Sequence, residues 1–108
     1  MKIMQGDSYA IPISLTQGGY VLTPDMVEDV EISVGESLIK KYSAGGVTFD
    51  ATSQQWYIRP TQAETLALEA NESYQVIARV KYKNTPADVK GINIGSIEVE
   101  DTFSTEVI

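Results

Sequence analysis

The longest regular pattern in this chain is a strict alternation of apolar and polar positions over Ser73–Tyr82. A period of two is that of a β-strand with one buried face, whereas at helical spacing the same apolar residues would spread around the helix axis. Such a strand needs an antiparallel sheet with a second layer over its apolar side. The residues expected to face inward are Tyr74, Val76, Ala78, Val80 and Tyr82.

Shorter alternating or apolar segments, separated by glycine and proline, predict further strands along the whole chain. They cover residues 2–5, 9–16, 20–22, 30–34, 38–42, 47–49, 55–59, 88–94 and 96–100. We expect about seven to nine of these segments to form short strands, and with the frequent turn signals they favour a β-sandwich, with a small barrel as the alternative. We therefore expect one all-β domain over residues 1–100, followed by an acidic C-terminal tail over residues 101–108.

Residues 61–68 are the only segment for which the sequence predicts a helix. Thr61 and Glu64 have the spacing of a capping box, in which each side chain accepts a hydrogen bond from the other residue's backbone amide. The segment allows one or two turns, too few to be stable without tertiary packing. It should therefore be one short helical turn that covers the edge of the core.

The segment over residues 9–16 is the candidate interaction edge. Proline cannot donate a hydrogen bond to a strand ladder, so Pro12 predicts an edge strand with its open side at that residue. Residues 8–22 carry no charge, which gives weak protection against the addition of a foreign strand. The predicted edge consists of Tyr9, Ile11, Pro12, Ile13, Ser14, Leu15 and Thr16, with Tyr9, Ile11, Ile13 and Leu15 turned inward.

Composition narrows the chemistry that is open to the protein. The chain has 108 residues, with no histidine and no cysteine. It therefore lacks the commonest general base, the commonest transition-metal ligand and any thiol nucleophile, and it cannot form a Ser-His-Asp triad or a disulfide. We predict no enzymatic activity, no catalytic residue, no metal site and no cofactor.

The formal net charge is −7, and both halves of the chain are acidic. An acidic surface repels phosphate backbones and anionic lipid, so we expect neither nucleic acid nor a membrane as a partner. The first residues lack the apolar core of a signal peptide, and no segment approaches the ~20 apolar residues of a membrane span. The chain should be made in a cytoplasm and not exported by that route.

Three groups of residues invite a functional interpretation, and a structural one is favoured for each. Trp56 and Tyr57 should face opposite ways on one strand, so they cannot form one sugar-stacking platform, and Trp56 should fill the core. The acidic run of Asp25, Glu28, Asp29 and Glu31 has no calcium-loop spacing and is expected to be a solvated face that blunts a sheet edge. Glu98, Glu100 and Asp101 are expected to be surface charges without a cleft.

The order of these features resembles the small immunoglobulin-like β-sandwich domains of tailed bacteriophages, closest to the N-terminal domain of the phage baseplate upper protein. The motifs that carry the resemblance are Gly6-Asp7, Leu22-Thr23, the Val-x-Ile-x-Val strand at residues 30–34, the Thr-x-x-Glu-Thr-x-x-Leu turn at residues 61–68, the Tyr-led strand at Tyr74 and Gly-Ser-Ile-Glu-Val-Glu at residues 95–100. Asn71-Glu72-Ser73-Tyr74 stands where the family usually has Gly-x-Tyr. The resemblance implies an antiparallel immunoglobulin-like sandwich.

The same resemblance implies a bacteriophage virion protein, synthesised in the host bacterial cytoplasm and located in the tail or baseplate. Its partners would be other virion proteins or further copies of itself. A head decoration or fibre-attachment domain is a second structural interpretation. A carbohydrate-binding module that contacts the host surface is a third, and binding to a glycan array would distinguish it from an adaptor.

Overall fold

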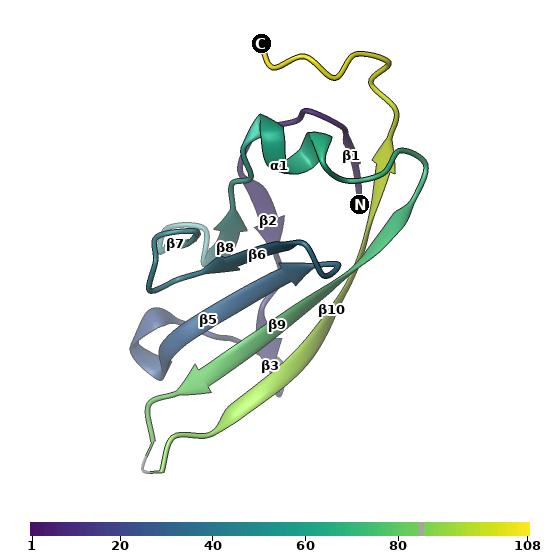
Figure 1. Cartoon of the computed structure of the whole chain (residues 1–108). Helices are drawn as coiled ribbons and strands as arrows, with labels where there is room; N and C mark the ends of the chain where they lie inside the picture. Colours follow the sequence, from purple (N-terminus) through teal and green to yellow (C-terminus); the bar gives the residue numbers. More distant parts are fainter. Residues whose placement is uncertain (85) are drawn as a thin grey trace.

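The computed structural model describes residues 1–84 and 86–108, and 49% of the chain lies in strands and 7% in helical turns (Figure 1). The chain is therefore mostly β-structure, as predicted. Within the described residues the strands are β1 (Lys2–Met4), β2 (Ile11–Ile13), β3 (Thr16–Gln17), β4 (Tyr20–Val21), β5 (Val27–Val34), β6 (Leu38–Lys41), β7 (Val47–Asp50), β8 (Gln55–Ile58), β9 (Ser73–Tyr82) and β10 (Val89–Glu100). The helical elements are a 3₁₀ turn, η1 (Pro24–Met26), and one α-helix, α1 (Gln62–Leu66).

The strands form two larger sheets and one small hairpin. The first sheet has the order β1-β10-β9-β5-β6, the second has the order β2-β8-β7, and β3 pairs with β4. The pairs are antiparallel except that β1 runs parallel to β10, with Lys2 opposite Glu98. The prediction of a purely antiparallel sheet is wrong for β1. A parallel pair needs a long connection, and here almost the whole chain lies between the two strands.

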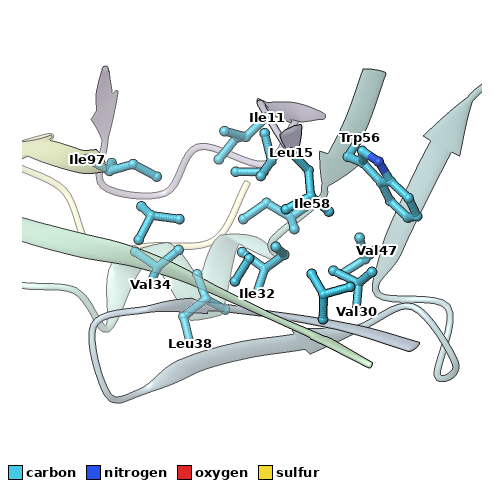
Figure 2. Close-up of a cluster of buried hydrophobic side chains, with 14 of the residues drawn as sticks. Ile11, Leu15, Val30, Ile32, Val34, Leu38, Val47, Trp56, Ile58 and Ile97 are labelled. Atoms are coloured by element: carbon cyan, nitrogen blue, oxygen red, sulfur yellow. The ribbon is translucent and has the colours of Figure 1, made fainter. Parts of the chain in front are cut away.

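The apolar faces of the two larger sheets share one core. Figure 2 shows Val30, Ile32 and Val34 of β5 on one side of this core and Ile11 and Ile58 on the other. On β9, Val76, Ala78 and Val80 are buried as the alternation predicts. Tyr74 and Tyr82, at the two ends of that strand, are only half-buried, because their hydroxyls bond to Glu69 and Gln17 near the surface.

Trp56 on β8 is completely buried, which confirms its predicted place in the core. Its indole Nε1–H donates a hydrogen bond to the carbonyl oxygen of Leu22 at 2.7 Å. The rings of Tyr42 and Phe49 lie 5.4 Å and 5.0 Å from it, centroid to centroid. Tyr57 is half-buried and belongs to the opposite side of the strand, so the two aromatic residues form no common platform.

The capping box at the start of α1 is present. Thr61 Oγ1 accepts from the Glu64 amide at 3.2 Å, and Glu64 Oε1 accepts from the Thr61 amide at 2.8 Å. Thr65 is the buried residue within the helix, and Leu68 follows it into the core. Lys40 Nζ lies 2.7 Å from Glu64 Oε1, so the cap also ties the helix to β6.

Two predicted strand boundaries are wrong. The segment over residues 9–16 is not one strand, since β2 covers only Ile11–Ile13 and Thr16 belongs to the separate β3–β4 hairpin. The two strands predicted over residues 88–94 and 96–100 are one strand, β10. A bulge between Asn93 and Gly95 shifts the register and lets β10 continue. Gly95 adopts a φ of 140°, a region that residues with a side chain rarely occupy.

Candidate interaction edge

One of the open strand edges among the described residues belongs to β2. This strand pairs with β8 on one side, with Pro12 opposite Tyr57, and no strand among residues 1–84 and 86–108 pairs with its other side. Ile11 and Ile13 are buried, whereas Pro12 is exposed. Pro12 therefore lies on an edge strand, as predicted.

The structure divides the predicted edge residues into two groups. Ile11, Ile13 and Leu15 are core residues, which confirms their inward orientation, while Pro12, Ser14 and Thr16 are exposed. Tyr9 was predicted to face inward but is 44% exposed, because it precedes β2 and the alternation of the strand does not reach it. Burial of part of its ring, and then the negative charge of Asp7, raise the pKa of Tyr9, so the phenol stays protonated at neutral pH.

A second open edge, which the sequence did not reveal, belongs to β10. Its outer side pairs with β1 only at Glu98, Val99 and Glu100. In the described part of the chain no strand pairs with that side over residues 89–97. Residues 91–97 carry no charge, and the inward-facing Ile92 and Ile94 are only half-buried. This long strand thus presents unpaired backbone groups beside incompletely covered apolar side chains.

The open edges of β2 and β10 face one groove. Pro12, Ile13 and Ser14 contribute one wall, and residues 94–97 of β10 contribute the other, with Met1 and Val76 completing the lining. The groove has a volume of about 350 Å³, and none of the described residues lining it has a charged side chain. An uncharged groove between two strand edges can accept an extended peptide, through backbone hydrogen bonds and apolar side chains.

The predicted tail, residues 101–108, leaves β10 at the end of the molecule opposite the β9–β10 hairpin (Figure 1). It forms no regular secondary structure. The amide of Ile108 donates to Gln62 Oε1 of α1 at 2.8 Å, and the amide of Phe103 donates to Asp101 Oδ1 at 2.8 Å. Phe103 is nevertheless 94% exposed and Val107 63% exposed. The tail therefore presents apolar side chains to solvent.

The acidic run does not blunt a sheet edge, because β5 lies between β9 and β6. Two of its carboxylates, Glu28 and Glu31, instead pair with cations on the neighbouring strands. Glu28 lies 3.3 Å from Lys81, and Glu31 lies 3.5 Å from Arg79 and 3.9 Å from Lys41. Asp29 accepts hydrogen bonds from the Ser43 amide at 2.9 Å and the Ser43 hydroxyl at 2.7 Å. Glu28, Asp29 and Glu31 thus form a network on the outer face of the five-stranded sheet, whereas Asp25 lies in η1 and accepts a hydrogen bond from the Thr23 hydroxyl.

Glu98 and Glu100 lie on the exposed face of β10, each 3.9 Å from Lys2 Nζ on β1. Their common partner is a lysine on the adjoining strand, an arrangement typical of a surface charge cluster. Among residues 1–84 and 86–108, no group of three or more acidic side chains is placed to hold a metal ion. Neither of the described helical elements is long and apolar enough to cross a bilayer.

Comparison with known proteins finds no matching family model, no matching curated protein and no matching solved structure. The geometry of the molecule therefore carries the functional argument. Its distinctive surface feature is the groove where the open edges of β2 and β10 meet.

Proposed function

We propose that this protein is a non-enzymatic structural adaptor of a tailed bacteriophage particle, in the tail or baseplate. It would act by self-association and by docking to neighbouring virion proteins. The observation that carries the proposal is the groove between β2 and β10, where both larger sheets leave a strand edge open. Natural β-proteins usually protect such edges, so an uncharged pair of them on one side of a small domain favours a surface that a partner covers.

The fold assignment within this proposal is an immunoglobulin-like sandwich. The five-stranded and three-stranded sheets and their common core support it. The motifs at Gly6-Asp7 and residues 30–34 support it through their resemblance to small phage domains. A rigid sandwich suits an adaptor, because its edges stay in a fixed relation to one another while the partners change.

The chemistry of the surface supports binding to protein. The chain contains no histidine or cysteine, and the paired carboxylates Glu98 and Glu100 are exposed and share Lys2 as a partner. The net charge of −7 disfavours contact with nucleic acid or anionic lipid. The uncharged groove is a patch on which a partner can dock without desolvating a charged side chain.

Two measurements test this proposal. Mass spectrometry of purified particles from the encoding phage should find the protein in a fixed ratio to the major tail proteins, and its absence would contradict a virion role. In the same phage, Ser14→Lys should place a charge in the groove and disrupt assembly, while the isolated variant keeps its circular dichroism spectrum. Thr52→Lys, an exposed turn position between β7 and β8, is the matched control and should assemble normally.

A glycan array separates the adaptor from a carbohydrate-binding module. We expect no sugar to bind, because Trp56 is buried and Tyr57 lies on the other side of its strand. Saturable binding to a defined glycan, lost on substitution of an exposed tyrosine such as Tyr20, would favour the carbohydrate-binding module.

A further inference from the structure

The tail, with its exposed Phe103 and Val107, and the groove lie on the same chain without covering each other, and each is suited to the other. We infer that residues 102–108 of one copy add as an extra strand to the open edge of β10 in a second copy. The side chains of Phe103 and Val107 would then enter the groove beside β2. This inference rests on the proposed self-association and names its contact.

The composition of the tail suits strand addition. Thr, Phe, Val and Ile, which favour β-structure, make up most of residues 102–108. In an extended conformation Phe103, Thr105 and Val107 fall on one face. Phe103 and Val107 are 94% and 63% exposed, so the tail exposes apolar surface that a partner can bury. The only charged side chain in the segment is Glu106.

The receiving edge matches the tail in length and in charge. Residues 89–97 of β10 extend over about 30 Å, and an extended segment of the tail's length needs about 23 Å. The only charged side chain on this part of β10 is Lys90, opposite in sign to Glu106. In a chain with a net charge of −7, an edge without a carboxylate is the part of the surface that repels another copy least.

A second copy is the appropriate occupant, because the tail cannot easily reach its own groove. β1 pairs with β10 at Glu98, Val99 and Glu100, directly beside the point where the tail begins. A tail that folded back along its own β10 would have to displace β1 and expose the buried side chain of Ile3. A neighbouring copy can present its tail to the groove without that cost.

The contact is heterologous, since the donor and acceptor surfaces differ. Each copy has one tail to donate and one groove to fill, so the contact either closes, in a reciprocal pair or a larger ring, or continues as a chain. Direct pairing of two β10 edges would instead be symmetric and would stop at a dimer. This difference allows a mixing experiment to decide between them.

The test uses the full-length chain and three double variants. The tail variant is Phe103→Ser with Val107→Ser, and the groove variant is Ser14→Lys with Ser96→Lys, all at exposed positions. The control is Tyr20→Ser with Met26→Ser, which removes exposed apolar side chains outside both surfaces. Circular dichroism establishes that each is folded, and sedimentation velocity over a concentration series gives the assembly state.

We expect the natural chain and the control to form oligomers, either a reciprocal dimer or larger assemblies, as the concentration rises. The tail variant and the groove variant, each measured by itself, should associate at least tenfold more weakly than the natural chain. An equimolar mixture of the tail and groove variants should form a one-to-one dimer and nothing larger, because it contains a single intact tail and groove per pair.

Three results would overturn the inference. They are a tail variant that assembles like the natural chain, a mixture of the tail and groove variants that stays monomeric, and a natural chain that stays monomeric at every concentration. The first two results leave the adaptor proposal intact, whereas a natural chain that stays monomeric would remove its self-association part. The mass spectrometry of particles tests the virion role separately. If the groove variant loses assembly while the tail variant keeps it, the contact is a direct pairing of two β10 edges.

Discussion

The two halves of β10 belong to one strand but have different surroundings. Over residues 96–100 the inward side chains, Ile97 and Val99, are buried, and β1 pairs with the outer edge at Glu98, Val99 and Glu100. Over residues 89–95 the inward side chains, Ile92 and Ile94, are half-buried, and that edge is open. Both halves pair with β9, from Val89 to Glu98, and a bulge between Asn93 and Gly95 interrupts the pairing in the open half.

This difference shows that the stability of the fold explains the conformation of one half of β10 but not that of the other half. Burial of Ile97 and Val99 accounts for the half that β1 covers, because each buried aliphatic side chain stabilises the fold by roughly 1.5–3 kcal/mol. The open half buries less and leaves backbone donors and acceptors without strand partners. Its conformation is held by β9 alone, which suits a surface that a partner completes.

The largest expected effect comes from placing a charge on each half in turn. Ile97→Asp should unfold the protein, because an unpaired buried carboxylate costs several kcal/mol out of a total stability of about 5–15 kcal/mol. Ile92→Asp should stay folded, because its half-buried side chain can reach water. Urea denaturation, monitored by the fluorescence of Trp56, measures the stability of both variants. Equal loss of stability would mean that the open half is part of the core.

A smaller effect tests whether β1 closes its half of the edge. Ile3→Ala should cost about 2–3 kcal/mol, since Ile3 is 4% exposed and its truncation leaves a cavity beneath β1. Met4→Ala, at the neighbouring 41% exposed position, should change stability by less than about 0.5 kcal/mol. Thermal denaturation of the pair provides the comparison, and indistinguishable midpoints would show that β1 is not docked.

The next prediction concerns the N-terminal cap of α1, whose loss should change the free energy of unfolding by about 1 kcal/mol. Thr61→Ala removes the side chain that accepts from the Glu64 amide, so the free energy of unfolding should fall by about that amount. Thr52→Ala, in an exposed turn, serves as the control and should have no measurable effect. If Thr61→Ala leaves the urea midpoint unchanged, the hydrogen bond at Thr61 does not stabilise the helix.

The smallest effect is a pH dependence at the same cap. Burial alone would raise the pKa of Glu64, but the Lys40 ion pair and the Thr61 amide together lower it below its ordinary value of 4.5. The ionised carboxylate therefore stabilises the folded state above that pH, and this contribution is lost as the pH falls. The stability difference between the natural chain and Glu64→Gln should shrink from pH 7 to pH 3. A constant difference would contradict the shift.

Local patterns in the sequence predicted the elements whose partners are near in the chain or whose period is unbroken. The alternation of Ser73–Tyr82 predicted β9 and three of its buried residues, and the spacing of Thr61 and Glu64 predicted the capped turn. Pro12 correctly predicted an edge strand at β2. In each case the physical cause lies within a few residues of the element itself.

The candidate site depended on features that no local pattern contains. The parallel pairing of β1 with β10 joins residues from opposite ends of the chain. Gly95 interrupts the alternation and predicts a break, whereas the structure accommodates it as a bulge. The open edge of β10 becomes visible only when both facts are known, and so only half of the groove, at Pro12 and Ser14, was predicted.

Amide hydrogen exchange tests the central claim, that the open edge of β10 is a pairing surface, at the level of single residues. In dilute solution the outward amides of residues 91–97 should exchange rapidly, while those of the central strand β9 are protected. At concentrations where the chain self-associates, exchange at residues 91–97 should slow at least tenfold, with β9 unchanged. Self-association that leaves exchange at residues 91–97 unaltered would contradict the account.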